Sequence, residues 1–527
     1  MPSVAIVGAG VAGLHLALFL QRHGVPTVLY ADRTGEQVRD GRLPNVVCRF
    51  GSTRERERVL GVQHWDDNGY GADLVQVRIG GEPPIAFRGR LSRQASYVDF
   101  RLYLPRLLAD YRERGGRLVH APDLDAATLA ARTAGHDLTV VAAGGRSLAP
   151  LFPRIASRSA AGPARTLLAG LFDGVTLPEP GSMCMELVPG AGEIFQSPVY
   201  SLAGRAVGLT FEAVLDGPWA RRLRTPFQDD PEGCARLVLD LLREAGSPIL
   251  DRIDRDRFAL TGPLDLLQGA ITPTVRRPWT RLGPGRYAVA VGDAAVLNDP
   301  VTGQGANLAS ASAWRLGQLI LDDPVFDERF CRDWARLQWE LARPVVSWTR
   351  AALRPPARHV VDLMRAAGAN QVLADAFQDN FDDPAAMWRS LATPGRARAF
   401  TARFAERADR APRLPDALVV DRELRLLRDL AQGAGPLLDP EAVLVTADGP
   451  HSAADWDGTG LAELAGYRLD RLTAAALLPL DDTVVLLTYQ LAAVTGAGPL
   501  YCSTLWRLGP PGWSAVLHQQ SPSPLAA

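Results

Sequence analysis

The stretch that decides the fold runs from residue 4 to residue 32 and reads VAIVGAGVAGLHLALFLQRHGVPTVLYAD. It opens with the apolar run Val4–Val7, which is typical of a buried strand, and continues with three glycines spaced as GxGxxG. Apolar residues then recur at helical spacing, and a second apolar run, residues 27–30, leads to Asp32. The pattern predicts a strand, a tight turn, a helix and a second strand, which is the opening βαβ unit of an α/β fold.

Each glycine of this turn has a separate role. Gly8 makes the turn, Gly10 lets the backbone approach a pyrophosphate, and Gly13 lets the helix pack against the strand. The start of the helix, at Val11 and Ala12, then receives the negative charge. The turn therefore predicts a dinucleotide cradle.

The residue that ends the second strand supports this interpretation. Asp32 follows Gly13 by 19 positions and is placed to accept hydrogen bonds from an adenosine ribose, with Arg33 beside it. A glycine-rich turn without a ligand is the alternative, and GxGxxG alone does not exclude it. The strand before the motif, the helix after it and the acid at this spacing favour a bound dinucleotide.

A second motif repeats the logic about 280 residues later. Gly292-Asp293 follows a predicted buried strand, and the run from residue 299 to residue 307 reads DPVTGQGAN. An Asp after a strand can bind a polyol hydroxyl, and a glycine-rich helix entry directs free N–H groups at an anion such as a reduced flavin. An ordinary Asp-Pro turn would explain this motif by itself, but the two motifs together favour a flavin. The predicted cofactor contacts here are Asp293, Pro300, Gly303, Gly305, Ala306, Asn307 and, in the turn after another strand, Gly144.

Composition excludes several classes of protein. With 57 Lys+Arg against 58 Asp+Glu the net charge is −1, so nucleic acid is not an expected partner. All the basic residues are Arg, which excludes Schiff-base chemistry and a P-loop lysine. The five scattered cysteines indicate reduced thiols and a cytoplasmic location. No apolar run is long enough to span a membrane. The eight histidines lack the spacing of a metal site.

The order of predicted elements indicates an α/β fold with an inserted antiparallel sheet, followed by a second domain. The boundary is expected at the proline-spaced segment Arg410–Pro415. The predicted parts are a larger α/β region at 1–412 and a small α+β domain at 413–527. Within the first, nucleotide-binding parts are expected at about 1–165 and 260–325, a substrate sheet at about 166–259 and a helical part at about 326–412.

The first region resembles the external, two-component flavoprotein monooxygenases of the styrene and indole monooxygenase type, within the p-hydroxybenzoate hydroxylase-like fold. The most specific matching runs are DPVTGQGAN and the segment Asp99–Tyr103. Further matching runs are VGAG with AGLHL near the N-terminus, Arg42-Leu43-Pro44-Asn45, residues 264–269 and Asp379-Asn380-Phe381.

The resemblance implies that reduced FAD comes from a separate reductase and reacts with O2 to a C4a-hydroperoxide. The distal oxygen then epoxidises or hydroxylates a small hydrophobic aromatic, indole or alkene substrate. Asn45 matches the family's active-site asparagine, with Pro300 and Gly303 as its catalytic neighbours, and Arg42 and Arg101 match secondary FAD contacts. Pro44 and Val46 depart from the family pattern, which leaves the preferred substrate open.

The tail from about Leu414 resembles the α+β cone of nuclear transport factor and polyketide cyclase (SnoaL-like) proteins. The matching runs are VVLLTY at 484–489, YCSTLWR at 501–507 and WSAVLHQQ at 513–520. This resemblance implies a ligand-handling accessory or a dimerisation module, and thus a homodimer as one arrangement.

Two other functions stay open at this point. The chain could be a single-component hydroxylase that oxidises NAD(P)H itself, although it shows one dinucleotide fingerprint and no second nucleotide cradle. It could also be a scaffold or carrier in which the C-terminal domain does the work.

Overall fold

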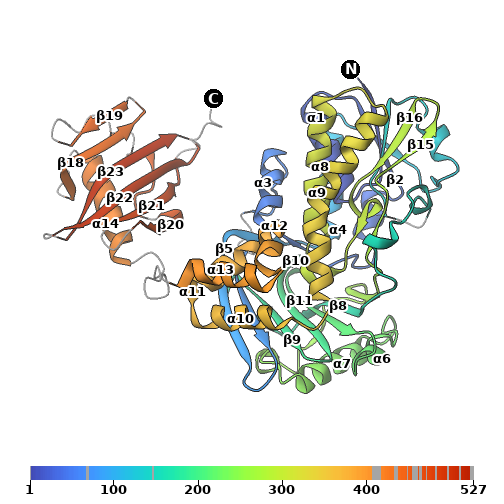
Figure 1. Cartoon of the computed structure of the whole chain (residues 1–527), viewed down its shortest axis with the longest axis horizontal. Coiled ribbons are helices and arrows are strands. Elements are labelled where there is room, and N and C mark those ends of the chain that lie inside the picture. Colours follow the sequence, from blue (N-terminus) through green and yellow to red (C-terminus); the bar gives the residue numbers. More distant parts are fainter. Residues whose placement is uncertain are drawn as a thin grey trace. The chain divides into compact units, whose positions relative to one another are not determined.

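The computed structural model describes residues 2–66, 71–144, 147–405, 417–432, 437–447, 449–453, 461, 464, 466–470, 472–480, 484–494, 498–509 and 512–522. The chain separates into two compact units, Met1–Ala408 and Asp409–Ala527 (Figure 1). The domain boundary that the sequence predicts, at Arg410–Pro415, lies outside the described residues. In the described part, no helix combines the length and apolar composition that a membrane crossing requires.

The first unit is built on a sheet whose strand order is β15-β16-β7-β1-β2-β6. All neighbours pair in parallel except β15 with β16. The strands are β1 (Val4–Val7), β2 (Thr27–Ala31), β6 (Arg117–His120), β7 (Leu138–Val141), β15 (Trp279–Gly283) and β16 (Arg286–Ala290).

Both faces of this sheet are covered, which explains why its strands are apolar without alternation. Val4 and Ile6 face one core together with the helices α1 (Val11–Arg22), α4 (Phe100–Glu113) and α8 (Gly305–Asp322). Ala5 and Val7 face a second core, to which α9 (Glu328–Ala352) also contributes. Helices α1 and α8 lie side by side (Figure 1), so two segments almost 300 residues apart begin at the same edge of the sheet.

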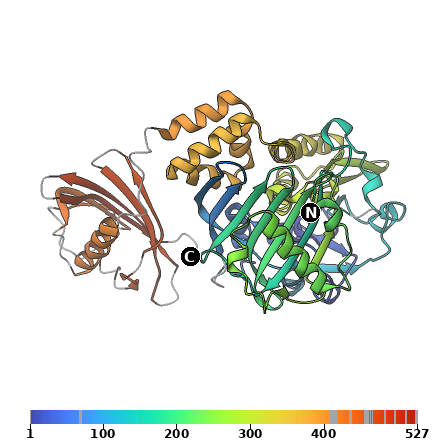
Figure 2. The same ribbon diagram turned by 90° about the horizontal axis from the view of Figure 1, so that it is seen from below.

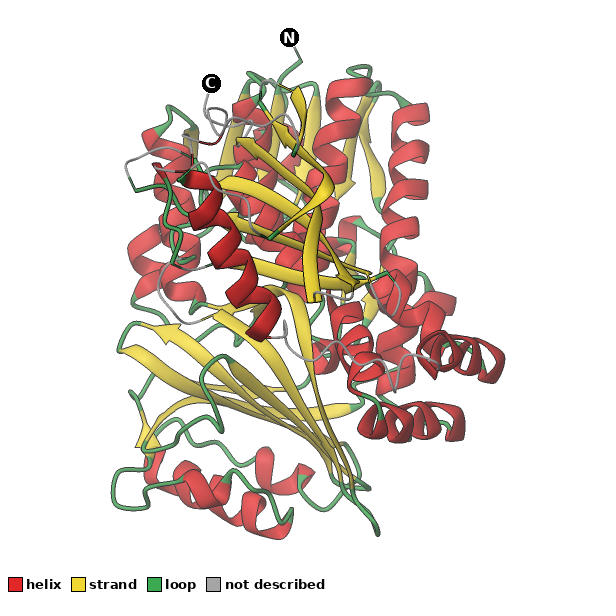
Figure 3. Ribbon diagram, turned by 90° about the vertical axis from the view of Figure 1, so that its left-hand side faces the viewer, coloured by secondary structure: helices red, strands yellow, loops and turns green. Residues whose placement is uncertain are grey.

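A second sheet is inserted, with the order β12-β8-β11-β10-β9-β4-β5-β3 and with β13 also paired to β8. One face packs on helices α6 (Ala220–Leu223) and α7 (Pro231–Glu244), which lie below the sheet in Figure 3. The strands are β3 (Cys48–Arg49), β4 (Gly71–Ile79), β5 (Ile85–Tyr97), β8 (Arg165–Asp173), β9 (Ser182–Val188), β10 (Gly192–Ser201), β11 (Gly204–Val214), β12 (Ala259–Leu260) and β13 (Leu266–Gly269).

Strands β3, β4 and β5 were not predicted from the sequence, which placed this sheet at about 166–259. They join it because β4 pairs in parallel with β9, more than 100 residues away. Such a pairing leaves no local signature. Helices α10 (Arg358–Ala369), α11 (Gln371–Asp379), α12 (Pro384–Leu391) and α13 (Pro394–Ala405) build one core with β4 and β5.

The second unit contains helix α14 (Ala417–Ala431) and a sheet in the order β19-β18-β23-β22-β21-β20. The apolar face of α14, with Leu426, Leu427 and Leu430, packs on the sheet (Figure 2). The strands are β18 (Leu438–Thr446), β19 (Gly449–Ser452), β20 (Thr473–Pro479), β21 (Val484–Leu491), β22 (Leu500–Gly509) and β23 (Gly512–Pro522). This is an α+β arrangement; its assignment to the SnoaL-like family stays a prediction.

The remaining short elements connect these parts. They are α2 (Gly35–Arg39), α3 (Gly51–Val59), α5 (Leu129–Arg132), the strand pair β14 (Thr274–Val275) and β17 (Val296–Leu297), and the 3-10 turns η1 (Ala149–Leu151), η2 (Ala156–Arg158), η3 (Leu250–Arg252), η4 (Gly292–Ala294), η5 (Pro300–Thr302) and η6 (Asn380–Asp382).

Candidate active site

A cavity of about 810 Å³ lies where the parallel sheet meets the inserted sheet. Segments that follow the carboxyl ends of β1, β2, β7 and β16 line it, because parallel strands deliver their following loops to one edge of the sheet. The two glycine-rich motifs therefore meet at one cavity. The volume lies within the range of small-molecule and cofactor sites.

The first motif shapes the cavity wall through backbone geometry. Gly8 has φ +114, and a Cβ there would lie 2.7 Å from the backbone nitrogen of Ala143. Gly13 does not line the cavity; a Cβ at this position would overlap the carbonyl oxygen of Gly8, so it serves helix–strand packing. A Cβ on Gly10 would meet no protein atom within 4 Å. Gly10 therefore leaves open space beside the start of α1.

Two helices begin at the cavity without a side-chain cap. The Ncap residue of α1 is Gly10, which has no side chain, and that of α8 is Gln304, whose side chain accepts no hydrogen bond from the first turn. Val11 and Ala12 of α1 and Gly305 and Ala306 of α8 line the cavity. Because the first amides of a helix have no partner within the helix, both starts offer N–H donors and a partial positive charge to an anion.

The predicted ribose ligand lies at the open side of the cavity. Asp32 and Arg33 both line it, with side chains that are 71% and 54% exposed. Their charged atoms are 3.8 Å apart, so the pair is a loose surface contact that leaves the carboxylate free to accept other donors.

Asp293 lies deep in the same cavity, beside the turn that follows β7. A Cβ on Gly144 would lie 2.6 Å from the Asp293 Cβ, so only glycine fits this approach. The Asp293 side chain is exposed to the cavity but is otherwise enclosed by protein. This enclosure raises the pKa of its carboxyl to about 6. The group can accept a hydroxyl hydrogen bond when it is ionised.

The part of the cavity next to the inserted sheet is mainly apolar. Leu167 of β8 and Leu267 of β13 contribute from that sheet, and the segment Pro44–Val47 contributes from the loop before β3. Asn45 is a polar residue within that wall, and its side chain is exposed. Gly303, with φ +64, and Pro300 approach from the second motif.

Besides Gly13, three predicted cofactor contacts are not among the residues that line the cavity. Arg42 is exposed at the surface. Arg101 is buried in ion pairs with Asp99, at 2.6 Å, and with Asp265. Asn307 accepts hydrogen bonds through its side chain from the Phe50 amide (3.0 Å) and from the Thr53 hydroxyl (2.8 Å) and donates to the Cys48 carbonyl (2.8 Å).

The lining residues Leu167, Leu267 and Ile271 were not predicted from the sequence. Leu267 lies in the run 264–269 that resembles the family, but nothing in the sequence distinguishes these three residues as a cavity wall from residues of a core. The strand pairing of β13 with β8 brings them to the cavity.

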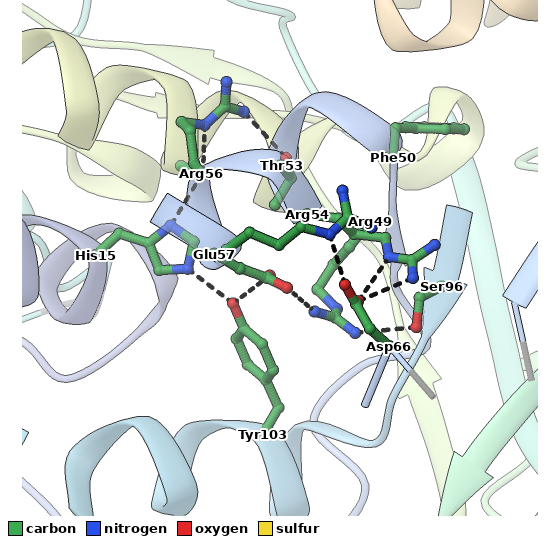
Figure 4. A network of polar contacts seen from close by, with 12 residues as sticks. His15, Arg49, Phe50, Thr53, Arg54, Arg56, Glu57, Asp66, Ser96 and Tyr103 are labelled. Carbon is green, nitrogen blue, oxygen red and sulfur yellow. Dashed lines mark hydrogen bonds and ion pairs between the residues drawn. The ribbon is translucent and has the colours of Figure 1, made fainter. Parts of the chain in front are cut away.

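Behind α1, away from the residues that line the cavity, a buried polar network joins four segments (Figure 4). His15 contacts the Ser310 hydroxyl at 3.0 Å and the Tyr103 hydroxyl at 2.7 Å, and Tyr103 donates to Glu57 at 2.7 Å. Burial, together with the neighbouring cations Arg56 and Arg49, lowers the pKa of His15 to about 3. The neutral imidazole thus holds α1, α4 and α8 together and takes no part in the cavity.

The cavity fits FAD in the features that can be compared. Its glycines leave room for a close approach of pyrophosphate at α1, and the start of α8 offers donors for the charged edge of a reduced flavin. Asp32 and Asp293 supply carboxylates that would accept hydrogen bonds from ribose and ribityl hydroxyls. The fold and the cavity define a nucleotide-binding protein of the flavoprotein class.

Comparisons with known proteins agree with this class. Residues 144–252 match the family described as "Styrene monooxygenase A putative substrate binding domain". The chain is 33% identical over 398 residues to the styrene monooxygenase StyA of Pseudomonas fluorescens, covering 75% of this chain and 96% of that protein. It is 32% identical over 409 residues to StyA of a Pseudomonas species, covering 76% and 98%.

Solved structures support the fold. PqsL of P. aeruginosa in complex with 2-aminobenzoylacetate has a TM-score of 0.50 at 17% identity, covering 66% of this chain and 95% of that one. A flavoprotein/dehydrogenase from Cytophaga hutchinsonii has a TM-score of 0.52 at 14% identity, covering 76% and 99%.

The chain belongs to the styrene monooxygenase family and is an FAD-dependent monooxygenase. The family resemblance and the cofactor predicted from the sequence are thereby confirmed.

Proposed function

We propose that this chain is the oxygenase component of a two-component system, which takes reduced FAD from a separate flavin reductase and uses O2 to epoxidise or hydroxylate a small hydrophobic aromatic, indole or alkene. The observation that carries the proposal is the apolar end of the cavity. Among the described lining residues, the ionisable side chains are Tyr30, Asp32, Arg33 and Asp293. None belongs to the wall formed by the inserted sheet and Pro44–Val47.

This distribution suits oxygen transfer to an apolar substrate. Bound reduced FAD supplies the oxygen-activating chemistry, so the protein needs no strong acid or base beside the substrate. The leucines at 167 and 267 and the valines at 46 and 47 exclude water and accept an apolar ring or alkene. The Asn45 amide offers one donor group and one acceptor to orient the substrate or flavin edge.

The residues of the second motif hold the cofactor in this arrangement. Asp293 would accept hydrogen bonds from ribityl hydroxyls, and the amides at the start of α8 would stabilise negative charge on the reduced flavin. The loop with Pro300 and Gly303 would lie beside the bound cofactor, because both residues line the same cavity. Gly303 has a left-handed backbone (φ +64), which favours glycine over residues with a side chain. No side chain therefore projects from the loop at this position.

We also propose an accessory role for the second unit, in dimerisation or in substrate handling. The matched StyA proteins are covered to 96% and 98% by about three quarters of this chain. The first unit has about that length. The second unit is therefore an addition to the part of the chain that matches the family's oxygenases. A measurement of the oligomeric state is the first test of its accessory role.

The experiment mixes the full-length protein with chemically reduced FAD, 18O-labelled O2 and styrene or indole. The expected result is a product that contains one labelled oxygen. Hydrogen peroxide as the sole oxygen product, with every substrate tried, would contradict the proposal. Oxidation of NADPH by the chain alone, coupled to product, would instead select a single-component enzyme.

A variant pair tests the apolar end. Leu267→Glu places a carboxylate in that wall and is expected to divert oxygen to hydrogen peroxide while FAD binding is retained. Leu264→Glu is the matched control, because Leu264 is 38% exposed and does not line the cavity. Equal product yields from the two variants would contradict the placement of the substrate.

A further inference from the structure

Four charged residues lie buried behind the loop that carries Pro300 and Gly303. They are Arg165 on β8, Glu193 on β10, Glu212 on β11 and Asp299 directly before Pro300, and each is at most 5% exposed. Three carboxyl groups thus share one guanidinium. Glu193 and Glu212 are also directly opposite each other in the β10–β11 pair, a position where like charges repel.

The guanidinium is committed to one of the three carboxylates. Arg165 donates from Nε to Oε2 and from Nη2 to Oε1 of Glu193, both at 2.7 Å. Its Nη1 donates to the carbonyls of Ala164 (3.2 Å) and Leu353 (3.4 Å). This bidentate pair is the strong one in the cluster, and it leaves the other two carboxyl groups to satisfy each other.

Glu212 and Asp299 each have one buried oxygen without a donor. Within the part of the chain that the structure describes, Glu212 Oε2 and Asp299 Oδ2 have no hydrogen-bond partner. The second Asp299 oxygen, Oδ1, accepts from the Val301 amide at 3.2 Å. The two side chains are close enough to hydrogen-bond to each other. Two carboxylates cannot do so, but a carboxylic acid and a carboxylate can.

The electrostatics point the same way. Burial raises the pKa of Glu212 well above the usual range of a carboxyl, and the negative charges of Asp299 and Glu193 raise it further. Arg165 opposes the shift. Burial also raises the pKa of Asp299. Two carboxyl groups this close titrate as a pair, and the last of their two protons is retained to a higher pH than a single carboxyl would retain it.

We propose that one proton, held between Glu212 Oε2 and Asp299 Oδ2, fastens the Asp299–Gly303 loop to the inserted sheet and so positions the cofactor cradle against the substrate wall. This inference rests on the proposed function, because it assigns that loop to the flavin. Glu212 and Asp299 are positioning residues: neither lines the cavity.

The shared proton also sets the charge behind the cradle. With the proton the four groups carry a net charge of −1, and without it they carry −2. Loss of the proton leaves two adjacent carboxylates that repel each other, which separates the loop from β11. It also adds negative charge near the start of α8, where the anionic ring of reduced FAD is stabilised. Reduced FAD should therefore lose affinity at alkaline pH more than oxidised FAD, whose ring is neutral.

Glu212→Gln is the decisive variant, because its amide can donate to Asp299 without a titrating proton. The first measurement is infrared spectroscopy of the full-length apo protein at pH 7. The wild type is expected to show the C=O band of a buried carboxylic acid that shifts in D2O, and Glu212→Gln is expected to lack it. Glu55→Gln is the matched control, since Glu55 has a 57% exposed side chain and should leave the band unchanged.

The second measurement is the affinity for reduced and oxidised FAD between pH 6 and pH 10, without substrate. In the wild type, the preference for reduced FAD should fall by about tenfold as the pair loses its proton, the size of effect expected for one added charge nearby. In Glu212→Gln the preference should stay constant.

The proposal is overturned if the wild type shows no carboxylic acid band, or if Glu212→Gln and wild type lose reduced FAD along the same pH curve. Both measurements are independent of turnover. A failure to oxygenate any substrate would therefore count against the proposed function without changing either measurement, whereas the two results above would remove the inference alone.

Discussion

Gly10→Ala separates the binding of FAD from the stability of the fold. Gly10 has φ −82 and ψ −174, an extended conformation that alanine adopts freely, and a Cβ there would meet no protein atom within 4 Å. At this Ncap position alanine is slightly worse than glycine, by about 0.5–1 kcal/mol, but it also lowers the entropy of the unfolded chain. The free energy of unfolding of the apo protein should change by less than about 1 kcal/mol.

The effect on the cofactor should be much larger. The new methyl group stands in the space beside the first amides of α1, where the pyrophosphate must approach. The loss of one hydrogen bond to a charged group is worth about 1.5–3 kcal/mol. At 1.4 kcal/mol per factor of ten, the Kd for FAD should rise by about 10- to 150-fold.

The assay is FAD titration of the apo protein, followed by fluorescence or calorimetry, together with urea unfolding without FAD. Gly13→Ala is the matched control in the same motif, because its Cβ would overlap the Gly8 carbonyl oxygen. That variant should lose about 1–3 kcal/mol of stability through overpacking. If Gly10→Ala keeps wild-type affinity and wild-type stability, the pyrophosphate does not lie at α1 and the reasoning is refuted.

Three further predictions concern charged and polar groups away from that turn. Because the pKa of Asp293 is raised to about 6, its burial costs stability once it ionises. Asp293→Asn should therefore stabilise the apo protein above pH 6, and this gain should fade as the pH falls towards 4. The same variant should bind FAD more weakly. A gain that is equal at pH 4 and pH 8 in thermal unfolding would contradict this. Arg101→Met leaves two buried carboxylates without their cation and should lower the free energy of unfolding by about 3–5 kcal/mol. The folded fraction should bind FAD with a Kd within a few-fold of wild type. A large loss of FAD affinity at unchanged stability would show that Arg101 contacts the cofactor directly. Thr504→Val removes a 2.7 Å hydrogen bond to the buried carboxylate of Glu423 and should destabilise the second unit by about 1.5–3 kcal/mol, seen as faster hydrogen exchange in α14 and unchanged exchange in α1.

Features that depend on residues close in sequence could be predicted, whereas features that depend on residues distant in sequence could not. The GxGxxG turn and the DPVTGQGAN run are short segments, and the positive φ of Gly8 and Gly303 is a property of the local backbone. Their positions at the cavity could therefore be predicted, including Gly8, Asp32, Asp293 and Gly303. Gly13, which the sequence analysis assigned to helix–strand packing, lies against the Gly8 carbonyl oxygen and does not line the cavity.

Family position was less informative for charged side chains. Arg101 and Asn307 belong to recognisable motifs, yet their side chains are directed to Asp99 and Asp265 and to the Phe50–Thr53 turn. A buried arginine or amide binds whichever partners the fold brings close, and those partners lie up to about 260 residues away. Spacing along the chain does not reveal them.

The sequence by itself determined the nucleotide-binding half of this protein, because backbone conformation at glycines and the start of a helix are properties of short segments. Only the tertiary structure decided the other half. The parallel pairing of β4 with β9 enlarged the inserted sheet, the pairing of β13 with β8 brought Leu267 to the cavity, and the packing of that sheet against the second motif placed Glu212 beside Asp299. The burial and the charges in these contacts come from residues that are distant in sequence. The contacts therefore form only when the chain folds.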